Sequence, residues 1–468
     1  MISGNLTYKD IEYFFILEND EELSLIPKDG FKEKSNALFF KPLDNGIPGA
    51  LVPIHPIVET DYLIGISSET NEKIIMIPKS YQIGHYNFVL KIIIKTVIKL
   101  NKKSSEISKL NFYSDELNYL YNTKKTIESV SKDIDKEIEL KLKSFEAVNF
   151  ETEVFNIDGR NVKCNFDIDK IFTGKDLENP LKIKTRMSFE FEATDDYMFV
   201  IKLYYVAKKS IQLLTYRQNI NFKEIYTCFL NNDSLYEKNG VIIVNDKTEI
   251  EDKVIISKRF MAIDYLKDYI HKIFQEIASA TLYTRHIPLS YEDSNIITES
   301  SFVLTTAGFE WEFSQLFPEG KEKTQARIDA ENIVISELNQ IEQNYIGKNG
   351  RVREICKNLN KFVDMKGLDS NIKYTFEQLD SIVRIFSNQL YRLKGEEAIY
   401  SDIGERLAKQ RNDFAHGNLN KEFVDLAFLD VVFLQRVIYI MQLKRIGVDD
   451  INIKKCINDL FQCNLLIE

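Results

Sequence analysis

Four residues near the C-terminal end have types and spacing that could perform acid–base chemistry on a phosphodiester. Arg411, Asn412, Asp413 and His416 lie within six consecutive positions. Arginine stays charged at any ordinary pH, and its planar fork matches phosphate oxygens. Histidine titrates near neutrality and can give or take a proton. Arg411 and His416 could therefore cleave a phosphodiester without a metal, Asn412 would hold the phosphate or the imidazole, and Asp413 is a supporting candidate.

The spacing of Arg411 and His416 constrains where the histidine must lie. Residues five apart on an unbroken helix differ by about 140° in direction. The two side chains would then point different ways. Gly417 follows the histidine and offers a helix break, so we expect His416 at a helix end, where the chain can redirect it.

The elements that would position these residues are all helical. From about residue 287 onward, apolar residues recur at helical spacing and the loops are short, which is typical of a helix bundle. The predicted helices are 299–317, 323–344, 351–363, 375–400, 402–416, 421–445 and a last short one within 450–468. We expect Trp311, the single tryptophan, in the core of this bundle.

The first part of the chain shows strand patterns instead. Residues 12–27 read as two apolar runs around an acidic turn, which predicts a hairpin. Residues 181–193 alternate apolar and polar side chains and predict a half-buried strand. Ser114 followed by Leu117, Leu120 and Tyr121 predicts a helix that continues, solvent-exposed, to about residue 145.

These patterns predict an α+β multidomain protein. A β-rich mixed N-terminal region, of one or two subdomains, spans 1–290, and an all-α domain spans 291–468. A chain of 468 residues exceeds what a single core usually holds.

Composition bounds the environment and the partners. The net charge of −10 argues against general coating of nucleic acid, so any RNA binding must be local. The five cysteines are scattered without a C-x-x-C pair, so we expect neither a metal cluster nor a disulfide framework. There is no pattern of a secretion signal or of a membrane span. We expect a cytoplasmic protein with no metal, no cofactor and no membrane partner.

The R-x4-H arrangement of Arg411-Asn412 and His416 resembles the signature of HEPN ribonuclease domains, which are small helical bundles. The nearest sub-family is the ApeA type of prokaryotic anti-phage proteins, which have a β-rich region ahead of an Apea-like HEPN domain. Two further segments are similar to that sub-family. They are Lys109–Asn122 (KLNFYSDELNYLYN) in the N-terminal region and Phe302–Phe313 (FVLTTAGFEWEF), where Glu310 matches an acid of the family's opening helix.

The resemblance implies an abortive-infection ribonuclease that cuts RNA, such as tRNA or another structured RNA, and leaves 2′,3′-cyclic phosphate and 5′-hydroxyl ends. It implies a homodimer or higher homo-oligomer through the HEPN bundle. It also implies an N-terminal region that senses a phage-derived trigger or restrains the bundle. Glu310 is then a supporting site residue, while Arg351 and Arg353 are candidates to grip the RNA backbone.

Non-catalytic interpretations of the same residues remain open. Arg411 could be an exposed helix residue and His416 a helix cap, and Arg351 and Arg353 could lie at a solvated helix end. The bundle could be a non-catalytic RNA-binding or assembly module, or a HEPN toxin neutralised by a partner. Some toxins of that kind carry a tyrosine two residues after the histidine; Asn418 stands there in this chain.

Overall fold

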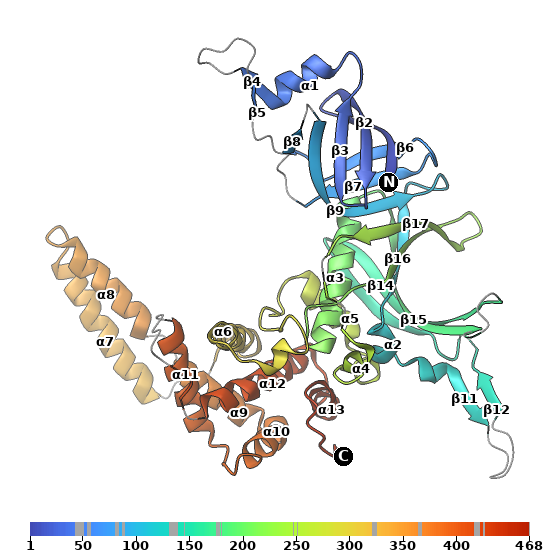
Figure 1. The fold of residues 1–468 in the computed structure, drawn as a ribbon. Coiled ribbons are helices and arrows are strands. Elements are labelled where there is room, and N and C mark those ends of the chain that lie inside the picture. The colour runs from blue at the N-terminus through green and yellow to red at the C-terminus, as the bar shows by residue number, and fades with distance from the viewer. Residues whose placement is uncertain are drawn as a thin grey trace. The chain divides into compact units, whose positions relative to one another are not determined.

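The computed structural model divides the chain into two compact units, Met1–Ser279 and Ala280–Glu468 (Figure 1). It describes residues 1–467 except 43–50, 54–57, 80–83, 87–88, 131–138, 145, 175–177, 179, 247, 250, 321–324, 364–366, 416–421 and 425. The first unit is rich in strands, and the second is helical. The chain is therefore a mixed α and β protein with a β-rich N-terminal region and a C-terminal helical region.

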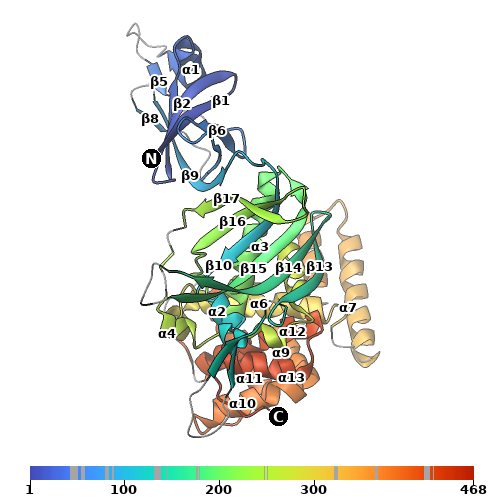
Figure 2. The same ribbon diagram turned by 90° about the vertical axis from the view of Figure 1, so that its right-hand side faces the viewer.

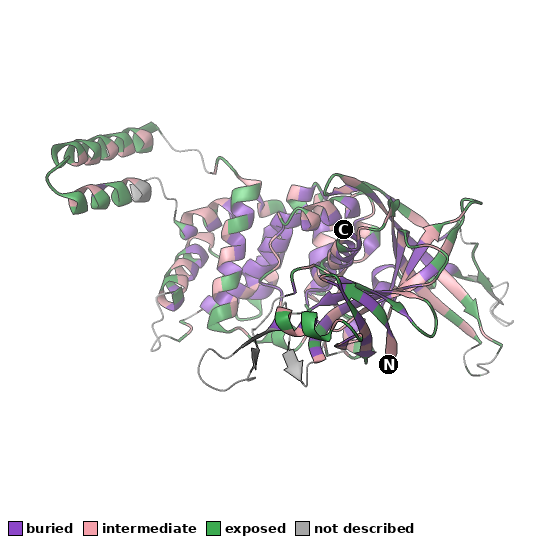
Figure 3. Ribbon diagram, turned by 90° about the horizontal axis from the view of Figure 1, so that it is seen from above, coloured by how far each residue is buried: buried purple, intermediate pink, exposed green. Residues whose placement is uncertain are grey.

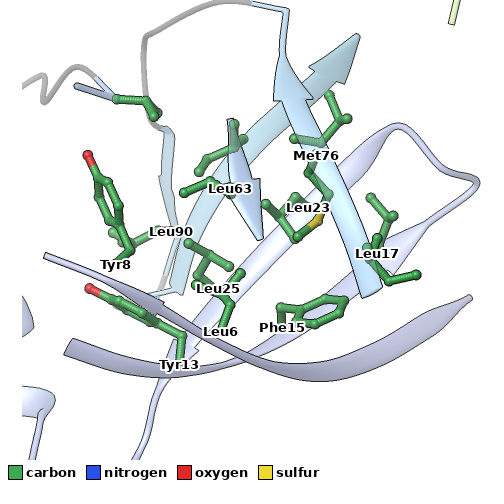
Figure 4. Close-up of a cluster of buried hydrophobic side chains, with 14 of the residues drawn as sticks. Leu6, Tyr8, Tyr13, Phe15, Leu17, Leu23, Leu25, Leu63, Met76 and Leu90 are labelled. Atoms are coloured by element: carbon green, nitrogen blue, oxygen red, sulfur yellow. The ribbon is translucent and has the colours of Figure 1, made fainter. Parts of the chain in front are cut away.

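Six antiparallel strands of the N-terminal unit pair in a closed ring. In pairing order they are β1 (Ile2–Tyr8), β2 (Ile11–Glu18), β3 (Glu22–Pro27), β9 (Val89–Leu100), β7 (Lys73–Pro78) and β6 (Leu63–Ser67), which returns to β1. The predicted hairpin is confirmed as β2 and β3. Alternate residues such as Tyr13, Phe15 and Leu25 point inward, and Figure 4 shows them packed with Leu63 and Leu90.

A second antiparallel sheet continues from the ring through β9. Its order is β13 (Phe150–Ile157), β14 (Arg160–Phe172), β15 (Leu181–Thr194), β10 (Ile107–Tyr113), β16 (Glu224–Leu230) and β17 (Tyr236–Val244), which pairs with β9. The strand predicted at 181–193 is confirmed as β15. Two helices, α3 (Tyr197–Thr215) and α5 (Ile270–Ala278), cover the apolar face of this sheet. Phe189 and Phe155 each lie 5.2 Å from the ring of Phe274 on α5.

The opposite face of the same sheet carries polar side chains, and Figure 2 looks onto the strands that form it. We call it the polar face. Its central residues are Asn165 and Asp167 of β14, Arg186, Ser188 and Glu190 of β15, and Lys109 and Asn111 of β10. Four of these seven side chains are buried, namely Asn165, Asp167, Ser188 and Asn111.

Smaller elements complete the N-terminal unit. They are α1 (Lys32–Phe39), β4 (Phe40–Pro42) with β5 (Leu51–Pro53), β8 (Gly84–Tyr86) on β9, and α4 (Lys253–Ile256). The long helix predicted from Ser114 to about 145 is wrong. One helical turn, α2 (Leu117–Leu120), is followed by a 3-10 turn and by a hairpin of β11 (Ile127–Val130) and β12 (Glu139–Leu142). The apolar residues span a single turn, so no further helical stripe is available to bury.

In the helical unit, α12 (Ala427–Ile446) is almost entirely buried. Around it pack α6 (Glu299–Leu316), α10 (Asp380–Arg392), α11 (Tyr400–Ala415) and α13 (Asp450–Leu460), while α9 (Leu368–Gln378) packs on α6 and α11. The single helix predicted over 375–400 is wrong. Two helices, α9 and α10, meet at Leu379, and the stretch from Leu393 to Ile399 lies outside both.

Two further helices form a separate hairpin of this unit. The helices α7 (Gln325–Asn344) and α8 (Gly350–Val363) pack on each other, and they are the antiparallel pair at the far left of Figure 3. No residue of α7 is buried. Among the described residues of α8, Cys356 is the one that is buried.

The unit boundary lies about ten residues earlier than the predicted 290. The reason is that residues 280–287 bond to the helices. The backbone N–H of Tyr283 donates to Glu312 Oε1 over 2.8 Å, and Gln442 donates to the Tyr283 carbonyl over 2.8 Å. Trp311 is half exposed rather than in the core, and its indole N–H donates to the Thr281 carbonyl over 2.8 Å.

Candidate active site in the helical unit

Arg411 and Glu310, which lie 101 positions apart in the sequence, meet between α11 and α6. Arg411 Nη2 donates to Glu310 Oε2 over 3.2 Å, and the two side chains are 38% and 39% exposed. An ion pair this accessible contributes about 1 kcal/mol or less to stability. Its consequence is geometric, since it holds one edge of the guanidinium while the rest faces solvent and can receive an anion.

The neighbours of Arg411 follow from the end of α11. Asn412 is exposed and Asp413 is half-buried. Ala415 is the last residue assigned to the helix, and His416 lies outside the described residues. The structure thus brings Arg411, Asn412, Asp413 and Glu310 into one region, and leaves the placement of His416 a prediction.

Gln410 fastens the chain that returns after the motif. Its Nε2 donates to the Glu422 carbonyl over 3.1 Å, and its Oε1 accepts from the Val424 backbone N–H over 3.0 Å. The Gln410 side chain is 2% exposed. One amide therefore satisfies two backbone groups on the far side of the 416–421 segment.

Three aromatic rings make a second attachment at the same place. Phe414 lies 5.5 Å from Phe302 of α6 and 5.1 Å from Phe423, and Phe302 lies 5.8 Å from Phe423. Ring pairs at such distances add attraction beyond the area they bury. Phe414 before the segment and Phe423 after it are thus both fixed against α6.

A buried carboxylate anchors α11 to α12. Asp430 is fully buried and accepts from Arg406 Nε over 2.7 Å and from Arg406 Nη2 over 2.8 Å, and the Tyr391 hydroxyl also donates to it. Burial raises the pKa of Asp430, while the hydrogen bonds from Arg406 and Tyr391 act in the opposite direction. A bidentate fork of this kind fixes the rotation of α11 about its axis, and Arg411 lies five residues further along.

The two arginines proposed to grip RNA lie on the hairpin. Arg351 is exposed at the start of α8. Arg353 Nη2 lies 3.6 Å from Glu342 Oε1 of α7, and Lys357 Nζ lies 3.8 Å from the same oxygen. Arg353 therefore has an acidic partner within the hairpin. This contact favours the interpretation of Arg353 as a residue at a solvated helix end.

Sequence reasoning missed Gln410, the three-ring cluster and the Arg406–Asp430 fork. One signal was available, because Asp430 is an acid inside the apolar run AFLDVVFL, and a carboxylate buried there requires a cationic partner. Gln410 gave no signal of its own. Its importance comes from two backbone groups that only the fold brings near it.

The described residues contain no group of three or more His, Cys, Asp or Glu side chains that could hold a metal ion. Among the described helices, none combines the length and the apolar character needed to cross a bilayer. No protein-family model, curated protein or solved structure gives a significant match to the chain. The site is therefore interpreted from its own geometry and from the R-x4-H motif.

Proposed function

We propose that the helical unit is a HEPN endoribonuclease and that the whole chain is a cytoplasmic anti-phage protein of the ApeA type. The observation that carries the proposal is the state of Arg411. It is a half-exposed guanidinium at the end of α11, held on one edge by Glu310 and followed by an exposed Asn412. This arrangement suits a phosphate ligand better than it suits stabilisation of the fold.

The proposed reaction uses two copies of the site across a two-fold axis. His416 of one copy takes the proton from a ribose 2′-hydroxyl as the 2′ oxygen bonds to phosphorus. His416 of the other copy gives a proton to the 5′ oxygen as its bond to phosphorus breaks. Arg411 stabilises the charge on the phosphoryl oxygens, and Asn412 orients the phosphate or the imidazole. The products are a 2′,3′-cyclic phosphate and a 5′-hydroxyl.

Glu310 has a defined part in this proposal. In the absence of RNA its carboxylate keeps Arg411 extended toward the site. A phosphate that arrives competes with Glu310 for the same guanidinium, and a bidentate contact favours the phosphate. Gln410 and Phe414, which precede residues 416–421, contact Glu422, Phe423 and Val424, which follow them.

The test is cleavage of total RNA in EDTA by the full chain, comparing wild type with Arg411→Ala and His416→Ala. Lys409→Ala is the matched control, because it removes an exposed cation from the same helix. We expect discrete fragments with cyclic phosphate ends from wild type and Lys409→Ala, and none from the other two. The same comparison in phage-infected cells supplies any trigger. Equal cleavage by all four proteins, or none by wild type in both settings, would refute the proposal.

A further inference from the structure

The hairpin that α7 and α8 form has almost no core of its own. No residue of α7 is buried, and Cys356 is the one buried residue among those described in α8. Helices in folded proteins are stabilised mainly by packing an apolar stripe against another element. Two helices of 20 and 14 residues that bury so little therefore lack part of the packing that stabilises helices of this length.

The contacts within the hairpin fix how the two helices run past each other. Arg353 Nη2 of α8 lies 3.6 Å from Glu342 Oε1 of α7, and Asn360 Nδ2 donates to Asn339 Oδ1 over 3.0 Å. The second contact lies further along α8 and further back along α7 than the first. The helices are therefore antiparallel, and these contacts set their register.

Four apolar side chains are exposed beside the packed positions of the hairpin. On α7, Val334 and Ile341 are 45% and 40% exposed, and on α8, Ile355 and Leu359 are 57% and 45% exposed. Each of them immediately precedes a residue that is buried or half-buried, in the same order Ile335, Glu342, Cys356 and Asn360. One position along a helix is a turn of about 100°. The four side chains thus point about a quarter-turn away from the contact between the helices.

These four side chains lie on the same side of the hairpin, which we call the hairpin face. Seen from one end, the residues of two antiparallel helices advance in opposite senses, so residues that precede the packed positions point to the same side in both helices. The residues that follow the packed positions point to the other side and are polar, namely Asn332, Ser336, Asn339, Gln343 and Lys357. An exposed apolar surface bordered by polar residues in this way marks an interaction site.

The charges of the two helices indicate what covers the hairpin face. The helix α7 has four Asp or Glu residues and one arginine, a net charge of −3, while α8 has four Lys or Arg residues and one glutamate, a net charge of +3. A hairpin with one acidic and one basic helix is complementary to a copy of itself. Stacking two hairpins face to face about a two-fold axis that runs along the helices places α7 of each copy on α8 of the other. An axis across the helices would instead place like charges on each other.

The register of the hairpin favours the same arrangement. Rotation about an axis that runs along the helices does not shift either copy along that axis. The contacts between α7 and α8 place Ile341 about level with Ile355. Ile341 of one copy therefore meets Ile355 of the other, and Leu359 of one copy meets the stretch between Val334 and Ile341 of the other. Apolar side chains thus face apolar side chains across the whole contact.

We propose that the hairpin face binds the hairpin face of a second copy of this chain. The four helices form an antiparallel bundle in which α7 of each copy packs on α8 of the other. The proposal is independent of the ribonuclease assignment, because the contact uses neither Arg411 nor His416. It concerns a surface that is separate from the candidate active site.

The first test is disulfide cross-linking between two full-length variants, Ile341→Cys and Ile355→Cys, co-expressed so that mixed dimers form. The five native cysteines are buried and do not compete. We expect a mild oxidant to join the two variants into a covalent dimer. Co-expression of Ile333→Cys with Ile355→Cys is the control, because Ile333 is 65% exposed on α7 but points away from α8. No covalent dimer from the first pair, or as much from the control pair, would overturn the proposal.

The second test is sedimentation of the full chain carrying both Ile341→Gln and Ile355→Gln. We expect half the mass of wild type at the same concentration and a dissociation constant at least about 100-fold higher, because each dimer loses four buried isoleucines. Ile333→Gln removes an equally exposed isoleucine outside the face and should keep the mass of wild type. Trp311 fluorescence, which reports a helix outside the hairpin, should match in all three proteins. A double variant with the mass of wild type, or a wild type that stays monomeric at every concentration, would overturn the proposal.

Discussion

Replacing Gln410 by methionine should free the chain that follows the R-x4-H motif without unfolding the bundle. Methionine has a similar length and keeps the apolar contacts of this buried side chain, but it removes both hydrogen bonds, to Glu422 and to Val424. Those two residues are exposed, so water takes over their backbone groups. Two hydrogen bonds at about 1 kcal/mol each give about 2 kcal/mol, which is roughly a 30-fold change in the local opening equilibrium.

Hydrogen exchange of the full chain measures that opening directly. Peptides containing the Val424 amide should exchange about 30-fold faster in Gln410→Met. Under the proposed function, RNA cleavage should fall by up to a similar factor, because His416 lies within the freed segment. Lys409→Met, an exposed neighbour on the same helix, should change neither quantity. Unchanged exchange at Val424 in Gln410→Met would refute the reasoning about the attachment, whatever the activity.

Three further predictions concern the same unit, and Trp311 reports unfolding in two of them. Glu310→Gln keeps the shape but releases Arg411, so RNA should bind about threefold more tightly in low salt, as measured by fluorescence anisotropy; weaker binding would contradict the competition. Asp430→Asn should lower the free energy of unfolding, measured by urea denaturation, by about 3 kcal/mol, because Arg406 keeps its charge beside a neutral partner. The double variant Arg406→Met with Asp430→Leu should recover most of that loss. Burial lowers the pKa of His286 to about 3. As the pH falls, the unfolded state therefore binds the proton first. The contribution of the neutral His286 to the free energy of unfolding is fully present above pH ~6.5 and is lost toward pH ~3. The free energy of unfolding should fall by about 2 kcal/mol between pH 7 and pH 5 in wild type but not in His286→Phe.

The helices of the C-terminal unit could be predicted from the sequence because their apolar residues repeat at helical spacing over long stretches. The helices α6, α7, α8 and α11 begin and end close to their predicted bounds. The break between α9 and α10 was missed because Phe376, Leu379, Ile382 and Val383 keep a helical rhythm across it. The periodicity of apolar residues indicates which side chains are buried, but it does not indicate where one helix ends and the next begins in a new direction.

The candidate site was predictable only in part. Arg411 was chosen from its residue type and its spacing to His416, and Glu310 from a resemblance. Their contact depends on how α6 packs beside α11, which no local pattern encodes. Gln410 could not be found, because its partners are backbone groups that carry no sequence signal. The strand 181–193 was recognised by its alternation, but its polar residues were taken as solvent-facing. Ser188 of this strand is buried instead, because the strand has neighbours on both sides, β14 and β10.

The strand β9 has a consequence for how the N-terminal unit comes apart. Its early residues pair with β3 and its later residues pair with both β7 and β17. One strand is therefore a member of the closed ring and an edge partner of the second sheet. Opening the ring at β9 also exposes the edge of β17, so neither hydrophobic core can be lost alone at low cost. We expect two cores but a single cooperative transition, with ring and sheet failing together.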